Sequence, residues 1–165
     1  MTTTGERSRG SRMIADWGSR ILRSRPLMRA PIWLYRLHLG WVLGRRMLLL
    51  EHTGRTSGKR REVVLEVFGE PAAGTFLVVS GFGDKAQWFR NVVAHDRVRV
   101  TIGWHGRRAA RARVVSQAEA DAALQAYAAH RPWAWNTFKP IIEETLGASI
   151  EESDTALPVV ALTLE

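Results

Sequence analysis

The chain has 165 residues and a formal net charge of +8, and it contains no cysteine. This length is typical of one domain that buries its own core, and the lack of cysteine excludes disulfides, zinc–thiolate sites and thiol nucleophiles. The five histidines, at positions 38, 52, 95, 105 and 130, have no metal-ligand spacing, so no metal site is predicted.

The positive charge is concentrated in the first third of the chain. Residues 1–62 hold 14 Lys and Arg against 4 Asp and Glu, a net charge of +10, while the other residues hold 10 against 12 and have a net charge of −2. Such an asymmetry predicts an anionic partner for the first third. A phosphate-bearing ligand, a nucleic acid and an acidic membrane surface all satisfy it.

Residues 1–46 are expected to precede the main domain. The polar residues 1–11 are predicted to be a disordered tail, and residues 12–46 a basic amphipathic segment that is helical in pieces. Its apolar run is too short to span a bilayer, but it can pack on the domain or lie on an anionic membrane. Because no secretory signal is recognised, we expect a cytoplasmic protein that this segment can hold on the inner face of the cell membrane.

From residue 47 onward the pattern changes to short strands. Alternating or continuous apolar runs predict strands at 47–53, 62–68, 75–80, 97–103, 107–115 and 157–164. Helices are predicted at 84–94, with Asp84 as the N-cap, and at 116–129, where Ser116 and Glu119 form a capping box. Residues 132–147 are a further helical or irregular insertion. This order favours a small six-stranded barrel of the mainly β, α+β class over residues 47–165.

The connection between the first two strands carries most of the charge. Residues 53–61 read Thr-Gly-Arg-Thr-Ser-Gly-Lys-Arg-Arg, with two glycines, hydroxyl side chains and four cations. Glycine lets backbone N–H groups approach an anion, and arginine can hold a phosphate through two parallel hydrogen bonds. The segment lacks the Walker and dinucleotide-binding patterns. It predicts a phosphate or carboxylate site, with a solvated basic hairpin as the alternative.

A second segment, residues 80–91, ends a strand and enters a helix. Trp88 and Asn91 are three residues apart and therefore share a helix face. Trp88 can form the wall of a pocket for a planar ring while Asn91 hydrogen-bonds the ligand. The alternative is that Trp88 belongs to the core and Asn91 is solvated.

Together these segments resemble the deazaflavin-dependent nitroreductases of actinobacteria, a branch of the split β-barrel flavin and deazaflavin oxidoreductases that includes quinone reductases. The matching residues are Leu48-Leu49-Leu50, the TGRxSG motif at 53–58 with Arg61, Ser80, the WFxN motif at 88–91, Val98, Val100 and Pro158-Val159-Val160. The resemblance covers about residues 40–165. Thr56 and Gly81 stand where lysine is common in the family.

The resemblance implies a six-stranded split barrel that binds coenzyme F420, whose phosphate and polyglutamate tail are anionic, with FMN as the alternative cofactor. It implies hydride transfer from the reduced ring to a lipophilic quinone, nitro or other electron-poor acceptor. The cofactor-binding residues that it implies are Arg55, Thr56, Ser57, Arg61, Val64, Val78, Ser80, Gly81, Gln87, Trp88, Arg90 and Asn91. Ser80 is also the candidate for a hydrogen bond to the ring or the acceptor, and Tyr127, Trp133 and Trp135 are candidates for the acceptor side.

Two other functions stay open from the sequence. The same fold can serve as a non-catalytic binder of lipids, fatty acids or membranes, which the basic N-terminal segment favours. It can also serve as an FMN-binding reductase, since one phosphate and one flat ring suit the same basic connection. Nucleic acid is not an expected partner, because no helix-turn-helix or RNA-binding motif occurs.

Overall fold

The computed structural model describes residues 44–165 apart from 148 and 152. The predicted tail at 1–11 and nearly all of the predicted segment at 12–46 lie outside these residues. The elements in chain order are β1 (Met47–Thr53), β2 (Arg60–Ala72), β3 (Thr75–Val79), the 3-10 turn η2 (Gly83–Lys85), α3 (Gln87–Ala94), β4 (Arg97–Ile102), β5 (His105–Val114), α4 (Gln117–His130), α5 (Pro132–Leu146) and β6 (Val159–Leu164).

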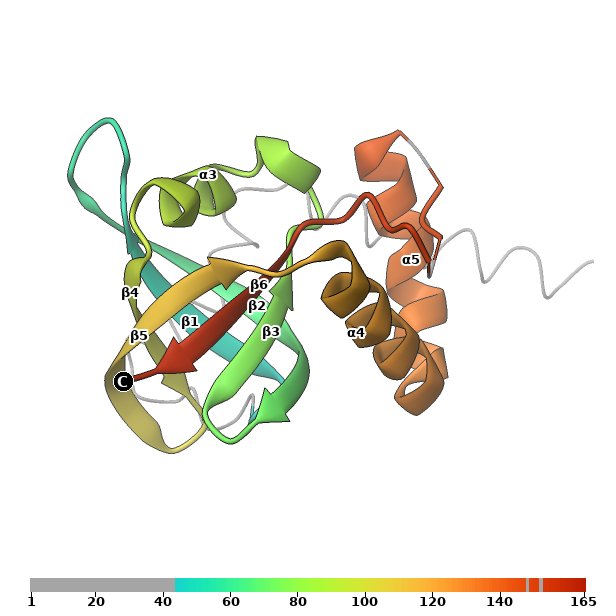
Figure 1. Ribbon diagram of the computed structural model, residues 1–165, viewed down its shortest axis with the longest axis horizontal. Helices are drawn as coiled ribbons and strands as arrows, with labels where there is room; N and C mark the ends of the chain where they lie inside the picture. The colour runs from blue at the N-terminus through green and yellow to red at the C-terminus, as the bar shows by residue number, and fades with distance from the viewer. Residues whose placement is uncertain (1–43, 148, 152) are drawn as a thin grey trace, which may run out of the picture.

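The six strands of the described residues close into one barrel, in the order β1-β2-β3-β6-β5-β4 (Figure 1). Every neighbouring pair is antiparallel, and β6 closes the barrel by pairing with both β3 and β5. Closure of this kind leaves no long unpaired sheet edge. The prediction of a small six-stranded barrel with inserted helices is confirmed.

The barrel interior is filled by alternate residues of the strands. Its fully buried side chains include Leu48, Leu50, Val78, Val100 and Leu162. Each such aliphatic side chain stabilises the fold by about 1.5–3 kcal/mol relative to leaving it in water. Trp88 and Val92 of α3 join this cluster, which explains why α3 lies across one end of the barrel, beside the β1–β2 connection (Figure 1).

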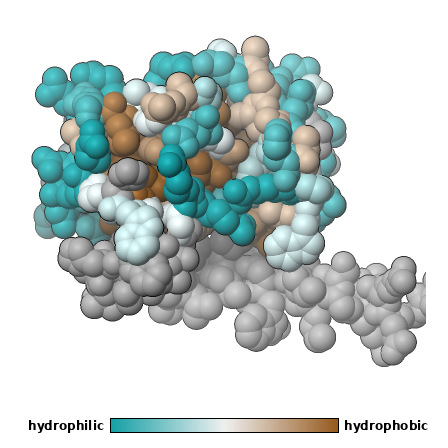
Figure 2. Space-filling model, turned by 90° about the horizontal axis from the view of Figure 1, so that it is seen from below, coloured by the Kyte–Doolittle hydropathy of each residue, from teal (hydrophilic) through white to brown (hydrophobic). Residues whose placement is uncertain are grey.

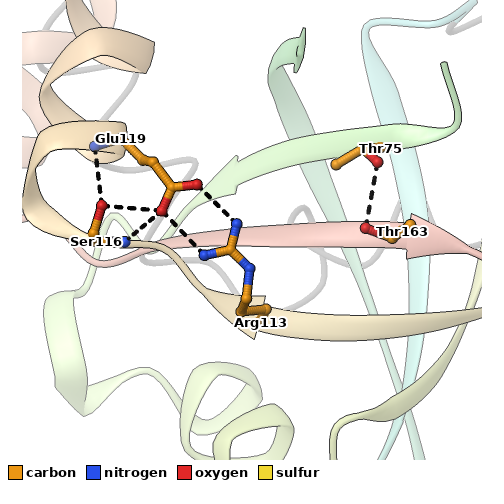
Figure 3. Close-up of polar contacts among 5 residues, drawn as sticks. All are labelled: Thr75, Arg113, Ser116, Glu119 and Thr163. Atoms are coloured by element: carbon orange, nitrogen blue, oxygen red, sulfur yellow. Dashed lines mark hydrogen bonds and ion pairs between the residues drawn. The ribbon is translucent and has the colours of Figure 1, made fainter. Parts of the chain in front are cut away.

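A second apolar cluster lies outside the barrel, where α4 packs on β2 and on α5. Phe68 points outward from β2 and stacks on Tyr127 of α4, with ring centroids 4.1 Å apart. The predicted capping box is confirmed, because the Ser116 hydroxyl accepts from the Glu119 backbone N–H while the Glu119 carboxylate accepts from that of Ser116 (Figure 3). Arg113 of β5 donates two hydrogen bonds to the same carboxylate, so it ties the start of α4 to the barrel.

The predicted helix at 84–94 is wrong at its start. The short turn η2 comes first, and the chain is extended at Ala86, with φ −59° and ψ 127°, before α3 begins at Gln87. Asp84 is therefore not the N-cap, and no side chain caps α3. The strand predicted at 62–68 is longer in the structure, because β2 continues through register shifts around Gly69.

Apolar and polar residues are unevenly spread over the surface of the described residues. On the face shown in Figure 2, apolar residues gather in the middle and hydrophilic residues frame them. The large apolar side chains that stay exposed are Phe82, Val93, Trp104, Val114 and Trp133. Phe82 is the one that also lines a cleft beside the basic β1–β2 connection.

Candidate active site

A cleft of about 750 Å³ joins the two segments that the sequence singles out. Its lining residues come from β1, the β1–β2 connection, the start of β2, and the stretch from Phe82 into α3. They are His52, Gly54, Arg55, Thr56, Ser57, Arg61, Glu62, Val63, Phe82, Lys85, Ala86, Gln87, Trp88 and Asn91. We call this space the ring cleft. Segments about 30 residues apart in the chain therefore form one concave site.

The β1–β2 connection is held in a closed loop by its own backbone. The Gly54 N–H donates to the Lys59 carbonyl at 2.8 Å, and the Gly58 N–H donates to the Gly54 carbonyl at 2.7 Å. Gly58 has φ +63°, which side-chain-bearing residues rarely adopt. A Cβ atom at Gly54 would lie 2.7 Å from the Ser57 hydroxyl oxygen. The backbone conformation thus favours glycine at position 58, and a side chain at position 54 would displace the Ser57 hydroxyl.

Asn91 connects this loop to α3. Its side-chain oxygen accepts a hydrogen bond from the Arg55 backbone N–H at 3.1 Å and another from the Arg55 guanidinium at 3.0 Å. The same guanidinium nitrogen donates to Gln87 at 3.0 Å. Asn91 is only 4% exposed. Its predicted place on the Trp88 face of α3 is confirmed, but its amide oxygen is engaged by Arg55.

His52 completes this network from β1. Because the Asn91 oxygen accepts from Arg55, the Asn91 side-chain N–H₂ is the donor to His52 Nδ1, at 3.2 Å. His52 Nδ1 must therefore be unprotonated. Burial lowers the pKa of His52, and the positive charge of Arg61 lowers the pKa further. A neutral histidine thus supports the asparagine that supports the loop.

The cations around the ring cleft differ in how they are held. Arg60 does not line the ring cleft, and its guanidinium pairs with Glu51 and Glu62. Among the described residues, no ion pair or hydrogen bond holds the side chains of Arg61 and Lys85, which both line the ring cleft. These two charges, together with Arg55, give the ring cleft the capacity to bind an anion.

Part of the ring cleft lining is apolar. It is formed by Val63, Ala86, Trp88 and the exposed ring of Phe82. Trp88 is 9% exposed, packs in the barrel core and also lines the ring cleft, while Asn91 is buried and not solvated. Contact of Trp88 with a planar ring stays a prediction. The Trp88 ring meets Phe89 edge-on, with centroids 6.1 Å apart and an interplanar angle of 85°. The core thus fixes the orientation of the tryptophan that walls the ring cleft.

A model of the F420H(2)-dependent quinone reductase family matches residues 27–142. The chain belongs to this family. It is therefore a deazaflavin-dependent oxidoreductase whose cofactor is coenzyme F420, as the resemblance implied. The comparison with curated proteins found no match.

Three solved structures are similar to this family member. A protein of unknown function from Agrobacterium tumefaciens is 18% identical, with 83% of this chain and 56% of that chain covered and a TM-score of 0.53. A pyridoxamine 5'-phosphate oxidase-related, FMN-binding protein from Nostoc punctiforme is 14% identical, with 82% and 80% covered and a TM-score of 0.51. An F420-H2-dependent reductase, FDR-A, is 23% identical, with 72% and 95% covered and a TM-score of 0.49. The first two support the split-barrel fold.

The ring cleft fits the chemistry of coenzyme F420, which combines a flat ring, a phosphate and a chain of glutamates. The apolar wall of Val63, Ala86 and Trp88 suits a flat ring. The unpaired Arg61 and Lys85 suit the phosphate, and they lie at the same cleft. The residues present in this family member therefore match the group in both respects.

Seven of the twelve predicted cofactor residues line the ring cleft: Arg55, Thr56, Ser57, Arg61, Gln87, Trp88 and Asn91. The structure does not bring the other five to its lining. Val78 is fully buried in the barrel, and Arg90 donates to the Asp84 carbonyl at 2.9 Å. Val64 pairs with Leu49, while the neighbouring Val63 faces the core and the ring cleft. Contact of these residues with the cofactor stays a prediction.

Ser80 and Gly81 lie where β3 leads into the turn before η2. Ser80 is fully buried, and its hydroxyl donates to the Gly83 carbonyl at 2.6 Å. This bond fixes the turn that carries Phe82 and Lys85. In this conformation the Ser80 hydroxyl is thus used within the protein, and its predicted bond to the ring or acceptor remains a prediction.

The three predicted acceptor-side residues lie on α4 and α5. Tyr127 is buried, donates to the Glu66 carboxylate at 2.8 Å and has a raised pKa, first because of burial and second because of that hydrogen bond. Trp135 is buried against it, with ring centroids 6.4 Å apart, while Trp133 is exposed. The structure does not place these residues on the ring cleft lining, so their contact with an acceptor also stays a prediction.

Sequence reasoning missed several lining residues. These are His52, Glu62, Val63, Phe82, Lys85 and Ala86. Phe82 and Lys85 lie within residues 80–91, the second segment identified in the sequence, so their position could have indicated that they line the site. His52 carried no such signal, because its role depends on a contact with Asn91, which is 39 residues away in the chain.

Proposed function

We propose that this enzyme transfers a hydride from reduced coenzyme F420 to a lipophilic, electron-poor acceptor, with quinones as the first class and nitro compounds as the second. The observation that carries the proposal is the ring cleft itself, in which unpaired cations and an apolar wall lie together. The family to which the chain belongs takes its description from quinone reduction. When bound, the coenzyme supplies the hydride.

The protein contributes binding, orientation and exclusion of water. Arg61, Lys85 and the free donors of Arg55 bind the anionic part of the coenzyme. Trp88 and Val63 cover the ring and keep water from it. The Asn91–Arg55 hydrogen bonds hold these two groups in one arrangement, so the ring is oriented before the acceptor arrives.

Phe82 supports a lipophilic acceptor. Its side chain is 44% exposed, and it stands at the ring cleft beside the apolar wall. An apolar molecule that covers an exposed aromatic ring removes apolar surface from water, which lowers the free energy of the complex. We assign Phe82 to the acceptor side of the site.

The N-terminal segment at 12–46 offers a second means of reaching a lipophilic acceptor. We propose that it associates with an anionic membrane surface, because it is basic and contains tryptophan. Among the described residues, no helix combines the length and the apolar character needed to span a membrane. Sedimentation of the full chain with anionic vesicles at low salt tests this part. Protein that stays in the supernatant would contradict it.

The test of the enzymatic proposal is anaerobic oxidation of reduced F420 by a soluble quinone. We expect turnover that requires the protein, and we expect the pair Arg55→Ala and Arg61→Ala to raise the coenzyme concentration for half-maximal rate at least about tenfold. Arg131→Ala, an exposed arginine away from the ring cleft, is the control. F420 binding without reduction of an acceptor of either class would contradict the proposed acceptors.

A further inference from the structure

A second cleft, of about 430 Å³, lies along β1, β4 and β5 on the other side of the β1–β2 loop. It shares His52 with the ring cleft. Its lining residues are Glu51, His52, Thr53, Gly58, Arg60, Arg97, Val98, Arg99, Arg107, Ala109, Ala110 and Glu165. We call this space the arginine cleft, because four arginines come to it from three different strands. None of the predicted cofactor residues lines it.

Two of the four arginines are fixed by a buried carboxylate. Glu51 is 7% exposed and receives a hydrogen bond from Arg107 at 2.6 Å. Arg60 lies 3.5 Å from the same carboxylate. Glu51 thus holds Arg60 and Arg107 in place and leaves their remaining N–H groups available.

The other two arginines, Arg97 and Arg99, are exposed, and no ion pair or hydrogen bond holds their side chains within the described part of the chain. Strand register places Arg99 opposite Glu51 on one side and opposite Ala109 on the other. The short side chain of Ala109 leaves the space that the arginines surround. Glu165, the other acidic residue of the lining, pairs with Arg111 at 3.6 Å. The arginine cleft therefore has an excess of positive charge.

We propose that the arginine cleft binds a small polyanion, that is, a molecule or segment with at least two carboxylate or phosphate groups. Arginines that are spaced around a hollow and partly held by a carboxylate suit carboxylate and phosphate groups, which they bind through paired N–H groups. Two sources have this chemistry. One is the glutamate tail of the coenzyme, which would reach it past Gly58 and Arg60, and the other is a separate anionic molecule.

The test uses inorganic pyrophosphate and single-charge variants of the full chain. Calorimetric titration should show pyrophosphate binding that Arg99→Gln weakens about tenfold, the usual effect of one lost bond between charged groups. Arg131→Gln removes one charge elsewhere and should leave the affinity within about twofold. Arg61→Gln distinguishes binding in the ring cleft from binding in the arginine cleft, because Arg61 lines the ring cleft alone. The thermal midpoint of Arg99→Gln should match that of the wild type, since its side chain holds no described partner.

The second arm compares coenzyme F420 carrying one glutamate with coenzyme carrying several. If the tail is the ligand, the longer tail tightens binding to the wild type, and Arg99→Gln removes that gain. If the ligand is a separate anion, tail length has no effect, and pyrophosphate binds equally well with the ring cleft saturated. The tail source rests on the cofactor assignment, whereas pyrophosphate binding does not. The proposal would be overturned if tail length has no effect on coenzyme binding and pyrophosphate affinity falls in Arg61→Gln but not in Arg99→Gln. It would also be overturned if tail length has no effect and pyrophosphate does not bind at all.

Discussion

Asn91 of α3 accepts two hydrogen bonds from Arg55 of the β1–β2 loop, one from its backbone N–H at 3.1 Å and one from its guanidinium at 3.0 Å. The same asparagine donates to His52 of β1. One buried side chain thus connects α3, the β1–β2 loop and β1, three of the segments that line the ring cleft. We propose that Asn91 is a positioning residue, which acts on the coenzyme through Arg55.

Asn91→Ala should destabilise the fold and weaken coenzyme binding together. The substitution leaves the Arg55 N–H and His52 Nδ1 without their partner in a partly buried place, at a cost of about 1–3 kcal/mol in the free energy of unfolding. Urea unfolding measures that cost, and fluorescence titration measures the affinity. Asn136→Ala, on the exposed surface of α5, is the matched control. Unchanged stability in Asn91→Ala would remove the positioning role.

Arg55 and Arg61 should respond differently to substitution. Arg61→Ala removes a charge that has no ion pair or hydrogen bond in the described residues, so it should lower coenzyme affinity at least about tenfold without changing the unfolding midpoint. Arg55→Ala should lower both, because Arg55 also bonds Gln87 and Asn91. Parallel titration and thermal unfolding of the two variants make the comparison. Equal effects of both on stability would contradict the assignment of Arg61 to the ligand alone.

Much of the fold could be predicted because its signals are local. The strand at 47–53 was predicted with its observed bounds, since a run of apolar residues ends where the Gly-bearing loop begins. The Ser116–Glu119 capping box depends on residues three apart, and it was also predicted correctly. Asp84 is not the N-cap because the backbone is extended at Ala86 and α3 begins only at Gln87. An alanine at position 86 gives no sign in the sequence of such a break.

The candidate site could be predicted only in part, for a related reason. The charged loop and the Trp88 segment are each visible in the sequence, and a family resemblance placed them on one ligand. Which partner each side chain takes is decided by contacts across the barrel. The hydroxyl of Ser80 bonds Gly83, and the amide of Asn91 bonds Arg55 and His52. Successive side chains of a strand point to opposite faces, and in β2 the face that lines the ring cleft carries Val63 and not Val64.

His52 should give the protein a pH-dependent stability. Its pKa in the folded state is lower than the ordinary 6.5, first because of burial. The unfolded chain therefore takes up a proton at this residue before the folded chain does. This contribution to stability is complete above pH 6.5 and is lost as the pH falls from 6.5 toward the folded-state pKa.

Urea unfolding between about pH 8 and about pH 5 measures this dependence. His52→Asn is the matched variant, since its side-chain oxygen can accept from Asn91 as Nδ1 does but cannot titrate. We expect His52→Asn to lose less stability than the wild type as the pH falls. The same slope in both proteins would show that His52 does not contribute.

Phe82→Ala should affect the acceptor more than the coenzyme. The ring is half-exposed at the ring cleft and bonds nothing, so its loss removes apolar contact from an acceptor. We expect a KM for a lipophilic quinone that is raised about tenfold, with coenzyme affinity changed less than about threefold. Val93→Ala, at an exposed position of α3 outside the ring cleft, is the control. An unchanged KM would exclude Phe82 from the acceptor side.

We propose that the ring cleft binds coenzyme F420 through the β1–β2 loop and Trp88. The most direct test is a fluorescence titration of the apoprotein with F420 and, separately, with FMN. We expect F420 to bind more tightly than FMN, and Trp88→Ala to weaken F420 binding about tenfold or more, since one stacked ring contributes about 1–3 kcal/mol. Tighter binding of FMN, or no detectable binding of F420, would contradict the assignment of the ring cleft to F420.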